Sequence, residues 1–178
     1  MGTNPAAGTF VSPEEYIQRF VYGGEKPASE YVDGVLIPKA IDTKPHATVQ
    51  VNIAFHIGSL YPNFNPLMQL STRLREGEFR VLDIAVEEMT HPIQGDYPGP
   101  GDPCHLCVEV KSPADRLPRL FAKMALYHSW GVLYGWVIDP ITKRFWESTR
   151  QNPIPREVNG RLTAGEIVLS AAQVLDRL

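Results

Sequence analysis

The sequence predicts an α/β fold, in which helices pack against a mixed β-sheet. Segments with helical apolar spacing alternate along the chain with groups of short β-prone runs. No internal repeat and no linker divides the 178 residues, so residues 1–178 are expected to form one domain. A composition of 43% hydrophobic and 21% charged residues is typical of a soluble globular protein.

The first elements follow from caps and turn residues. Ser12, Pro13 and Glu15 predict a helix start, and this helix should run to about Val21, before Gly23-Gly24. The segment 29–40 contains two short β-prone runs around Asp33-Gly34, which predicts a hairpin. A second helix should begin at Pro45 and end near Leu60. Its apolar side would carry Val49, Ile53, His56 and Leu60.

The remaining elements are read in the same way. Residues 67–89 predict two strands joined at Glu76-Gly77, and the proline- and glycine-rich residues 90–103 predict a long loop. A strand at 106–111 then leads to a helix from about Ala114 to Trp130, with Gly131 at its end. Further strands are expected at 133–140, 143–149 and 166–170, and a short helix at 171–178.

Charge and targeting signals restrict the class of protein. A net charge of −3 argues against a protein that coats nucleic acid through bulk charge, but it permits a local basic patch. The opening residues MGTNPAAGTF lack a basic region followed by an apolar run, so no signal peptide is expected. No apolar run reaches the roughly 18 residues of a membrane span. We therefore expect a cytoplasmic protein without membrane contact.

The two cysteines, Cys104 and Cys107, have the CxxC spacing of zinc and redox sites. A structural zinc site usually has a second ligand pair, and a redox CxxC begins a helix, whereas this pair precedes a strand. Two small buried side chains at a strand entry are the favoured interpretation. A CxxC metal or redox protein remains the third functional alternative.

Charged residues stand inside two of the predicted strands. In a strand, alternate residues share a face, so Glu109 and Lys111 lie with Cys107, opposite Leu106 and Val108. On patterning alone, a solvent-facing side is the favoured interpretation of Glu109 and Lys111. Asp83 is harder to explain in this way, because it lies on an otherwise apolar stripe.

The alternative interpretation is a metal-dependent site that cleaves phosphodiesters. Two carboxylates from neighbouring strands can hold Mg²⁺ or Mn²⁺ through oxygen ligands. The metal polarises the phosphate and lowers the pKa of a bound water, and a nearby lysine stabilises the charge that develops. Asp83 followed by Glu109-x-Lys111 supplies these groups, although this pattern is common by chance.

A longer set of motifs supports the second interpretation. The segments RVLDIAVEE, LCVEVKSPAD and KMALYHSWGVLYGWVIDP resemble the Uma-type family of bacterial putative restriction endonucleases, a domain of unknown function in the PD-(D/E)XK nuclease superfamily. The family's E-V-x-S-P strand end falls on Glu109 to Pro113 and its K-x-x-x-Y on Lys123 and Tyr127. The resemblance covers roughly residues 13–170 and implies a restriction-endonuclease-like core. Leu82 replaces the proline that usually precedes the aspartate.

The resemblance implies a role for each matching residue. Asp83, Glu109 and the backbone carbonyl of Val110 would bind Mg²⁺ or Mn²⁺, and Glu30, in the family's E-x-x-D-G segment, would add an outer carboxylate. Lys111 would be the catalytic lysine. Lys123 competes for that role, because it lies one helical turn from Tyr127 on the same helix face.

The implied activity is hydrolysis of DNA phosphodiester bonds by a magnesium-dependent endonuclease. The alternative is a module that keeps the fold and binds nucleic acid or protein without catalysis. Nucleases of this fold often pair to cut two strands, so the resemblance leaves a homodimer open.

Overall fold

The computed structural model describes residues 10–40 and 43–178. Its helices are α1 (Pro13–Tyr16), which continues as the π-helix η1 (Ile17–Tyr22), then α2 (Lys44–Leu60), α3 (Leu117–Trp130) and α4 (Ala171–Val174). Its strands are β1 (Ser29–Val32), β2 (Val35–Pro38), β3 (Phe64–Arg75), β4 (Glu78–Glu88), β5 (Leu106–Val110), β6 (Tyr134–Asp139), β7 (Arg144–Thr149), β8 (Arg156–Val158), β9 (Arg161–Ala164) and β10 (Ile167–Ser170).

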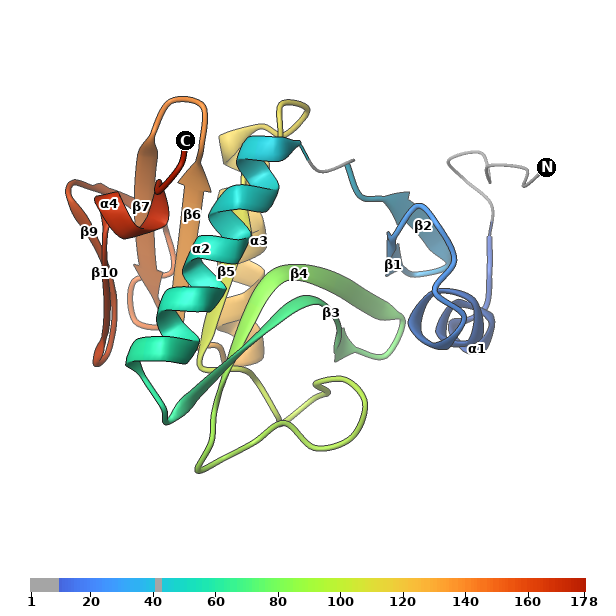
Figure 1. Ribbon diagram of the computed structural model, residues 1–178. Helices are drawn as coiled ribbons and strands as arrows, with labels where there is room; N and C mark the ends of the chain where they lie inside the picture. Colours follow the sequence, from blue (N-terminus) through green and yellow to red (C-terminus); the bar gives the residue numbers. More distant parts are fainter. Residues whose placement is uncertain (1–9, 41–42) are drawn as a thin grey trace.

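The main sheet is mixed, as predicted. Its strands follow the order β2-β1-β4-β5-β6-β7-β8, and β3 pairs with β4. The β5–β6 pair is parallel, and α3 supplies the crossover between these two strands; the other pairs are antiparallel. Figure 1 shows α2 in front of the sheet and α3 behind it, while β9 and β10 form a separate ribbon beside α4.

Strand pairing is interrupted along the edge of β4 that faces β5, and the candidate functional site lies at this gap in the pairing. β3 pairs along nearly the whole length of β4, so the other partners of β4 share its opposite edge. On that edge β1 pairs at Glu78 and Phe79, and β5 pairs at Ile84 to Val86. Residues 80–83 therefore lie between two partner strands, and Figure 1 shows β4 passing from the β1–β2 hairpin to β5.

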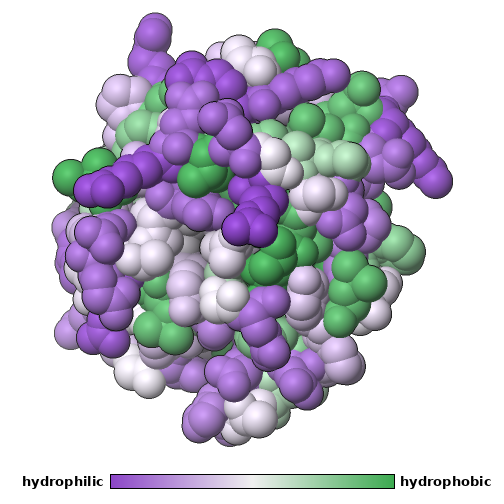
Figure 2. All heavy atoms as spheres, turned by 90° about the vertical axis from the view of Figure 1, so that its left-hand side faces the viewer, coloured by the Kyte–Doolittle hydropathy of each residue, from purple (hydrophilic) through white to green (hydrophobic). Residues whose placement is uncertain are grey.

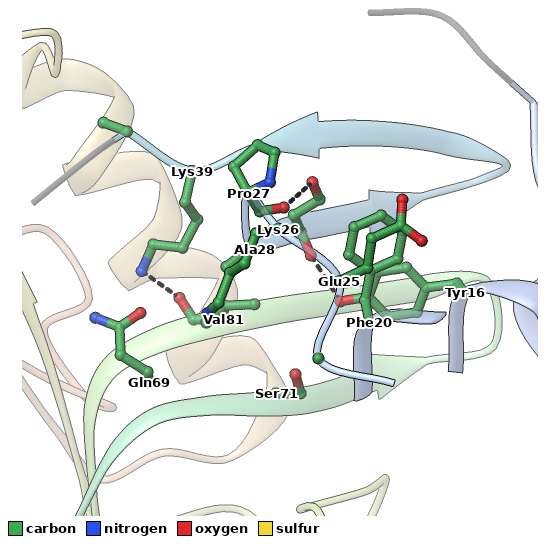
Figure 3. Close-up of a pocket in the computed structure, with 13 residues that line it drawn as sticks. Tyr16, Phe20, Glu25, Lys26, Pro27, Ala28, Lys39, Gln69, Ser71 and Val81 are labelled. Carbon is green, nitrogen blue, oxygen red and sulfur yellow. Dashed lines mark hydrogen bonds between the residues drawn. The ribbon is translucent and has the colours of Figure 1, made fainter. Parts of the chain in front are cut away.

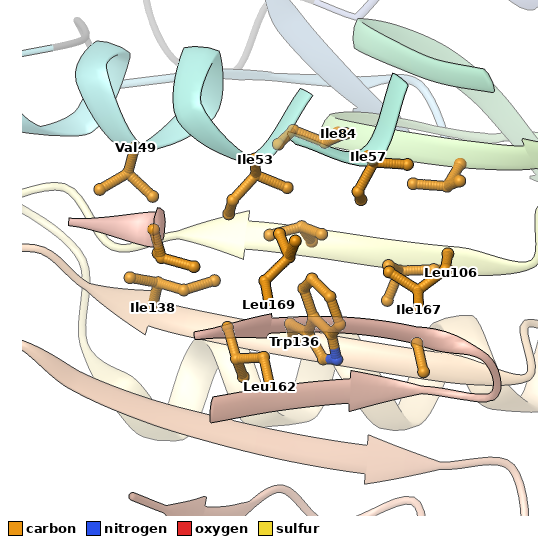
Figure 4. Packing of buried hydrophobic residues seen from close by; sticks show 14 of the residues in the cluster. Val49, Ile53, Ile57, Ile84, Leu106, Trp136, Ile138, Leu162, Ile167 and Leu169 are labelled. Atoms are coloured by element: carbon orange, nitrogen blue, oxygen red, sulfur yellow. The ribbon is translucent and has the colours of Figure 1, made fainter. Parts of the chain in front are cut away.

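The core forms on both faces of the sheet. Val49, Ile53 and Ile57 of α2 are fully buried against one face, where β5, β6 and the β9–β10 ribbon complete the packing (Figure 4). Burial of one such side chain contributes about 1.5–3 kcal/mol. On the other face, Leu120 and Met124 of α3 are buried against the sheet.

Buried and exposed side chains alternate along the β9–β10 ribbon, as expected for an antiparallel ribbon with one covered face. Ile167 and Leu169 are fully buried, whereas Val168 between them is 37% exposed.

Figure 2 shows the face at the left of Figure 1, where hydrophilic side chains are interspersed with smaller apolar groups. Among the described helices, none is long and apolar enough to span a bilayer.

Most predicted elements are confirmed. The Ser12 hydroxyl accepts a hydrogen bond from the Glu15 amide at the start of α1, and Asp33 and Gly34 turn the β1–β2 hairpin with φ of 46° and 92°. The β3–β4 turn lies at Glu76-Gly77.

Three expectations were wrong in detail. The buried side of α2 carries His46, Gln50 and Ile57, and not His56 or Leu60. Helix α3 begins at Leu117, three residues later than expected, with Pro118 in its first turn, where a missing N–H costs no hydrogen bond. Strands β8 and β9 were not expected, because short polar segments carry little β pattern.

Candidate active site

Asp83 lies in the gap between β1 and β5 and is only 2% exposed. Its Oδ1 accepts a hydrogen bond from Lys39 Nζ at 2.6 Å, and its Oδ2 accepts one from the Val110 amide at 2.8 Å. Lys39 also donates to the Val81 carbonyl at 2.8 Å. The Lys39 side chain thus hydrogen-bonds to β4 within residues 80–83, where neither β1 nor β5 pairs with it.

Glu109 of β5 is also 2% exposed, so the solvent-facing interpretation was wrong for this residue. Its Oε1 accepts a hydrogen bond from the Tyr127 hydroxyl at 2.9 Å, and its Oε2 accepts one from Lys123 Nζ at 3.0 Å. Both donors come from α3, where the spacing of four residues places them on one helix face. The helix therefore holds both oxygens of a buried carboxylate.

Lys123 connects Glu109 to Glu30. Its Nζ lies 2.9 Å from Glu30 Oε1, and the other oxygen of Glu30 accepts a hydrogen bond from Arg80 at 3.0 Å. Arg80 also pairs with Glu78. The structure thus brings Glu30 into the same cluster as Glu109 and Asp83, although it lies on the β1–β2 hairpin, far from both in sequence.

The structure does not bring Lys111 into this cluster. Strand β5 ends at Val110, and the Lys111 amide donates to the Ile138 carbonyl of β6. The Lys111 ammonium lies 3.5 Å from Asp139 at the end of β6. Lys123 is therefore the lysine beside Glu109, and the expected position of Lys111 next to both carboxylates does not hold.

The Val110 carbonyl lies on the side that the sequence suggested. The N–H and C=O of one strand residue point to the same side, and the Val110 N–H points to Asp83. The next amide, that of Lys111, points the other way, to β6. The carbonyl of Val110 therefore faces the gap together with Asp83.

A cleft of about 230 Å³ joins these groups. Asp83, Glu109, Glu30 and Lys123 line it together with Lys39, whereas Lys111 is not part of its lining. The cleft opens between the β1–β2 hairpin and the N-terminal turns of α3. It is the place where a ligand can reach both buried carboxylates.

The pKa values of the two central carboxyl groups shift in opposite directions. Burial alone raises the pKa of Asp83, but Lys39 and His46 more than offset burial and hold it below its ordinary value. Burial raises the pKa of Glu109, and Lys123 only partly opposes this effect. Burial lowers the pKa of Lys123, yet Glu109 and Glu30 outweigh burial and raise it. Such a divergence is common at functional sites.

Sequence reasoning missed three residues at the site. Neither Lys39 nor His46 was assigned to the site from the sequence, yet the His46 Nε2 lies 3.3 Å from Asp83 Oδ2. Gln69 of β3 donates from Nε2 to Asp83 Oδ1 at 3.3 Å. No local pattern marks these residues, since each reaches Asp83 from another segment of the chain.

A family model described as "Uma2: Putative restriction endonuclease" matches residues 13–175. The chain belongs to the Uma2 family. The prediction of that family from the sequence motifs is therefore confirmed. In this member of the Uma2 family, both residues of the K-x-x-x-Y motif, Lys123 and Tyr127, donate hydrogen bonds to the carboxylate of Glu109.

A solved structure agrees with the fold. The chain is similar to a crystal structure described as a putative nuclease belonging to DUF820 from Anabaena variabilis ATCC 29413, with a TM-score of 0.72 and 19% identity. The similarity covers 85% of this chain and 91% of the other. At this identity it establishes the restriction-endonuclease-like fold that the resemblance implied. Comparison with curated proteins found no match.

The Uma2 site fits a hard divalent cation in its donor chemistry. Within residues 10–40 and 43–178, no three or more His, Cys, Asp or Glu side chains are grouped to hold a metal. Mg²⁺ needs fewer protein ligands, since it is usually held by one or two carboxylates, waters and substrate phosphates. Asp83 and Glu109 with the Val110 carbonyl form such a set. A cation would have to replace the ammonium groups of Lys39 and Lys123.

The CxxC pair lies elsewhere in the Uma2 fold. Cys104 and Cys107 are buried in the core beneath α3, with their Sγ atoms 3.4 Å apart. Burial raises the pKa of the Cys107 thiol, which disfavours the reactive thiolate. The two thiols pack as small apolar groups in this structure.

Gln69 has a strained backbone directly opposite Asp83. Its neighbours pair as Met68 with Ile84 and Leu70 with Leu82, while Gln69 itself has a left-handed φ of 52°. A residue other than glycine pays about 1–2 kcal/mol for this conformation. Such strain persists when the surrounding structure enforces it, commonly at functional sites.

We expect Gln69→Gly to be more stable than Gln69→Ala by about 1–2 kcal/mol, because glycine relieves the left-handed strain and alanine keeps it. Thermal unfolding should place the glycine variant about 2–8 °C higher. Ser71 on the same strand is the control, because its φ is not positive. There the alanine variant should be the more stable, and equal melting temperatures for both Gln69 variants would contradict the strain.

Proposed function

We propose that this protein is a divalent-metal-dependent endonuclease that hydrolyses phosphodiester bonds of DNA. One observation carries the proposal: Asp83 and Glu109, from the adjacent strands β4 and β5, are both buried and both line one cleft. The pKa values of these two carboxyl groups are shifted in opposite directions, by Lys39 and His46 at Asp83 and by burial at Glu109, and such shifts in a cleft are common at functional sites. Membership of the Uma2 family, described as "Putative restriction endonuclease", supports the same activity.

Asp83, Glu109 and the Val110 carbonyl would hold Mg²⁺ or Mn²⁺. When bound, such a cation polarises the phosphate and lowers the pKa of a bound water. Glu30 lies 2.9 Å from the Lys123 ammonium, so it would hold this lysine in the cleft and serve as the outer carboxylate of the set. Lys39, once released from Asp83, is a further cation for a phosphate oxygen.

Lys123 is proposed as the catalytic lysine in place of Lys111. Its ammonium is fixed between Glu109 and Glu30 and is 12% exposed, at the wall of the cleft. With a metal at Glu109, the pair with Glu30 would keep this ammonium at the cleft, where it can offset negative charge on the phosphate as the transition state forms. Lys111 has no corresponding position, because it contacts Asp139.

Nicking of supercoiled plasmid DNA in the presence of Mn²⁺ tests the proposal. The wild-type chain should nick the plasmid, and Asp83→Asn should not. Asp176→Asn is the matched control, because Asp176 is 58% exposed near the C-terminus. DNA binding without nicking by the wild-type protein would instead support the non-catalytic binding module. Nicking that survives in Asp83→Asn would refute the assignment of Asp83.

A further inference from the structure

A second and larger cleft adjoins the candidate active site. It has a volume of about 590 Å³, which lies within the range of small-molecule sites, about 300–1,000 Å³. It lies between the segment that precedes β1 and the strands β3 and β4. Figure 3 shows Lys39 and Gln69 at one end and Phe20 and Tyr16 at the other. We call it the Phe20 cleft.

The Phe20 cleft is continuous with the site of the carboxylates. Lys39 and Ala40 line both cavities. Gln69 lines the Phe20 cleft and also bonds to Asp83 through its amide. A group bound in the Phe20 cleft therefore lies one side chain away from Asp83, because the Gln69 amide reaches from this cleft to Asp83.

The lining combines an aromatic wall with hydrogen-bonding groups. Phe20 is half-buried, and its ring stacks on Tyr16 with centroids 5.3 Å apart. The Gln69 amide offers both a donor and an acceptor, and the Ser71 hydroxyl can serve as either. An aromatic wall with such polar groups suits a flat heteroaromatic ligand, since aromatic pairs pack favourably both offset and edge to face.

The charges around the Phe20 cleft favour an anionic ligand. Glu25 is the acidic residue of its lining, and Arg19 neutralises it with two bonds of 2.7 Å. Lys26 is exposed on the rim, and Lys39 lies at the inner end beside Asp83. A ligand with a flat ring and a phosphate fits this arrangement.

We propose that the Phe20 cleft binds one unpaired nucleobase of the substrate strand, next to the phosphate that is cut. This inference rests on the proposed nuclease function. A base inside a duplex is stacked and paired, so it can enter a cavity only from a single strand or by flipping out. The cleft therefore favours DNA that is already single-stranded or unpaired at the cleavage position, because such a base enters without the cost of unpairing and unstacking.

Binding measured without metal separates this inference from cleavage. The probe is a short single-stranded DNA oligonucleotide carrying 2-aminopurine, and the reference is the same strand in a blunt duplex, both in the presence of a chelator. The wild-type chain should bind the single strand at least tenfold more tightly and change the 2-aminopurine fluorescence. Phe20→Ala should weaken binding about tenfold, as expected when one base loses an aromatic contact.

Two further variants make the result interpretable. Ser71→Met fills part of the Phe20 cleft without removing Phe20 and should also weaken binding about tenfold. Phe55→Ala is the matched control, because Phe55 is 65% exposed on α2. It should bind like the wild type. Melting curves establish that each variant is folded.

The outcomes distinguish the two proposals. Equal binding of single strand and duplex, or unchanged binding in folded Phe20→Ala and Ser71→Met, overturns the inference. If the wild-type protein then still nicks duplex plasmid and Asp83→Asn does not, the proposed function stands and only the further inference fails. Selective, Phe20-dependent binding of the single strand without Mn²⁺-dependent cleavage would refute the hydrolytic function, and with it the placement of the base beside a phosphate that is cut.

Discussion

Lys123→Met is expected to reduce metal-dependent DNA cleavage by about 10²–10³-fold, because it removes a fixed cation from the cleft. Lys111→Ala is expected to cleave at nearly the wild-type rate. The Lys111 ammonium contacts Asp139, which also accepts hydrogen bonds from the amides of Ile141 and Thr142. Loss of Lys111 should therefore cost only about 1 kcal/mol of folding stability. Initial nicking rates and urea unfolding provide the two measurements.

The fold of Lys123→Met needs a control of its own. Without the shared ammonium, Glu30 and Glu109 are buried with less compensation, which costs about 3–5 kcal/mol. Adding Glu30→Gln removes one of these carboxylates and should recover part of the stability but none of the cleavage. Full cleavage in folded Lys123→Met, or loss of cleavage in Lys111→Ala, would reverse the assignment of the lysine.

Asp83→Asn and Glu109→Gln are expected to abolish cleavage alike but to differ in stability. Asp83→Asn removes the partner of Lys39 in a buried ion pair, which costs about 3 kcal/mol. In Glu109→Gln, the side chain at position 109 can still accept the hydrogen bond from the Tyr127 hydroxyl, and Lys123 is still paired with Glu30. Burial already penalises the charged form of Glu109, so this variant should lose about 1 kcal/mol or less.

The pH dependence of stability should separate the same two residues. The pKa of Asp83 is lowered by folding, so its contribution is present above the unfolded value of about 3.9 and is lost as pH falls through the folded value. The pKa of Glu109 is raised, so stability declines as pH rises from about 4.3 through its folded value.

Urea unfolding between about pH 3 and 7 measures both effects. Asp83→Asn should lose less stability than the wild type on acidification, and Glu109→Gln should lack the decline at rising pH. Parallel stability curves for both variants and the wild type would show that neither carboxyl group has the inferred environment.

The sequence predicted the central carboxylates because strand alternation and family motifs are local. Asp83 on an apolar stripe and Glu109 on the face of Cys107 were both identified before their burial was known. Alternation does not reveal where a strand ends. Lys111 was expected beside Glu109, but β5 ends at Val110. The Lys111 side chain contacts Asp139 instead.

The rest of the site depends on contacts between distant segments. Lys39 and Asp83 are 44 residues apart and meet only because β1 and β5 leave a gap along β4. No local pattern encodes that gap or the left-handed backbone of Gln69. Hairpins were easier to predict, because Asp33-Gly34 and Glu76-Gly77 carry their turn chemistry in two residues.

Two buried carboxylates that face one cleft would repel each other if they had no cationic partner. The structure instead pairs Asp83 with Lys39 and Glu109 with Lys123, at 2.6 Å and 3.0 Å. A divalent cation must therefore compete with two ammonium groups. Metal affinity in the absence of DNA should be lower than a pair of bare carboxylates would give.

A crystal structure of the full chain soaked with Mn²⁺ tests the central claim most directly. Anomalous scattering should locate manganese in the cleft between Asp83 and Glu109, coordinated also by the Val110 carbonyl. The ammonium groups of Lys39 and Lys123 should have withdrawn from those carboxylates. Both lysine pairs intact at millimolar Mn²⁺, with no manganese in the cleft, would contradict the metal-dependent site.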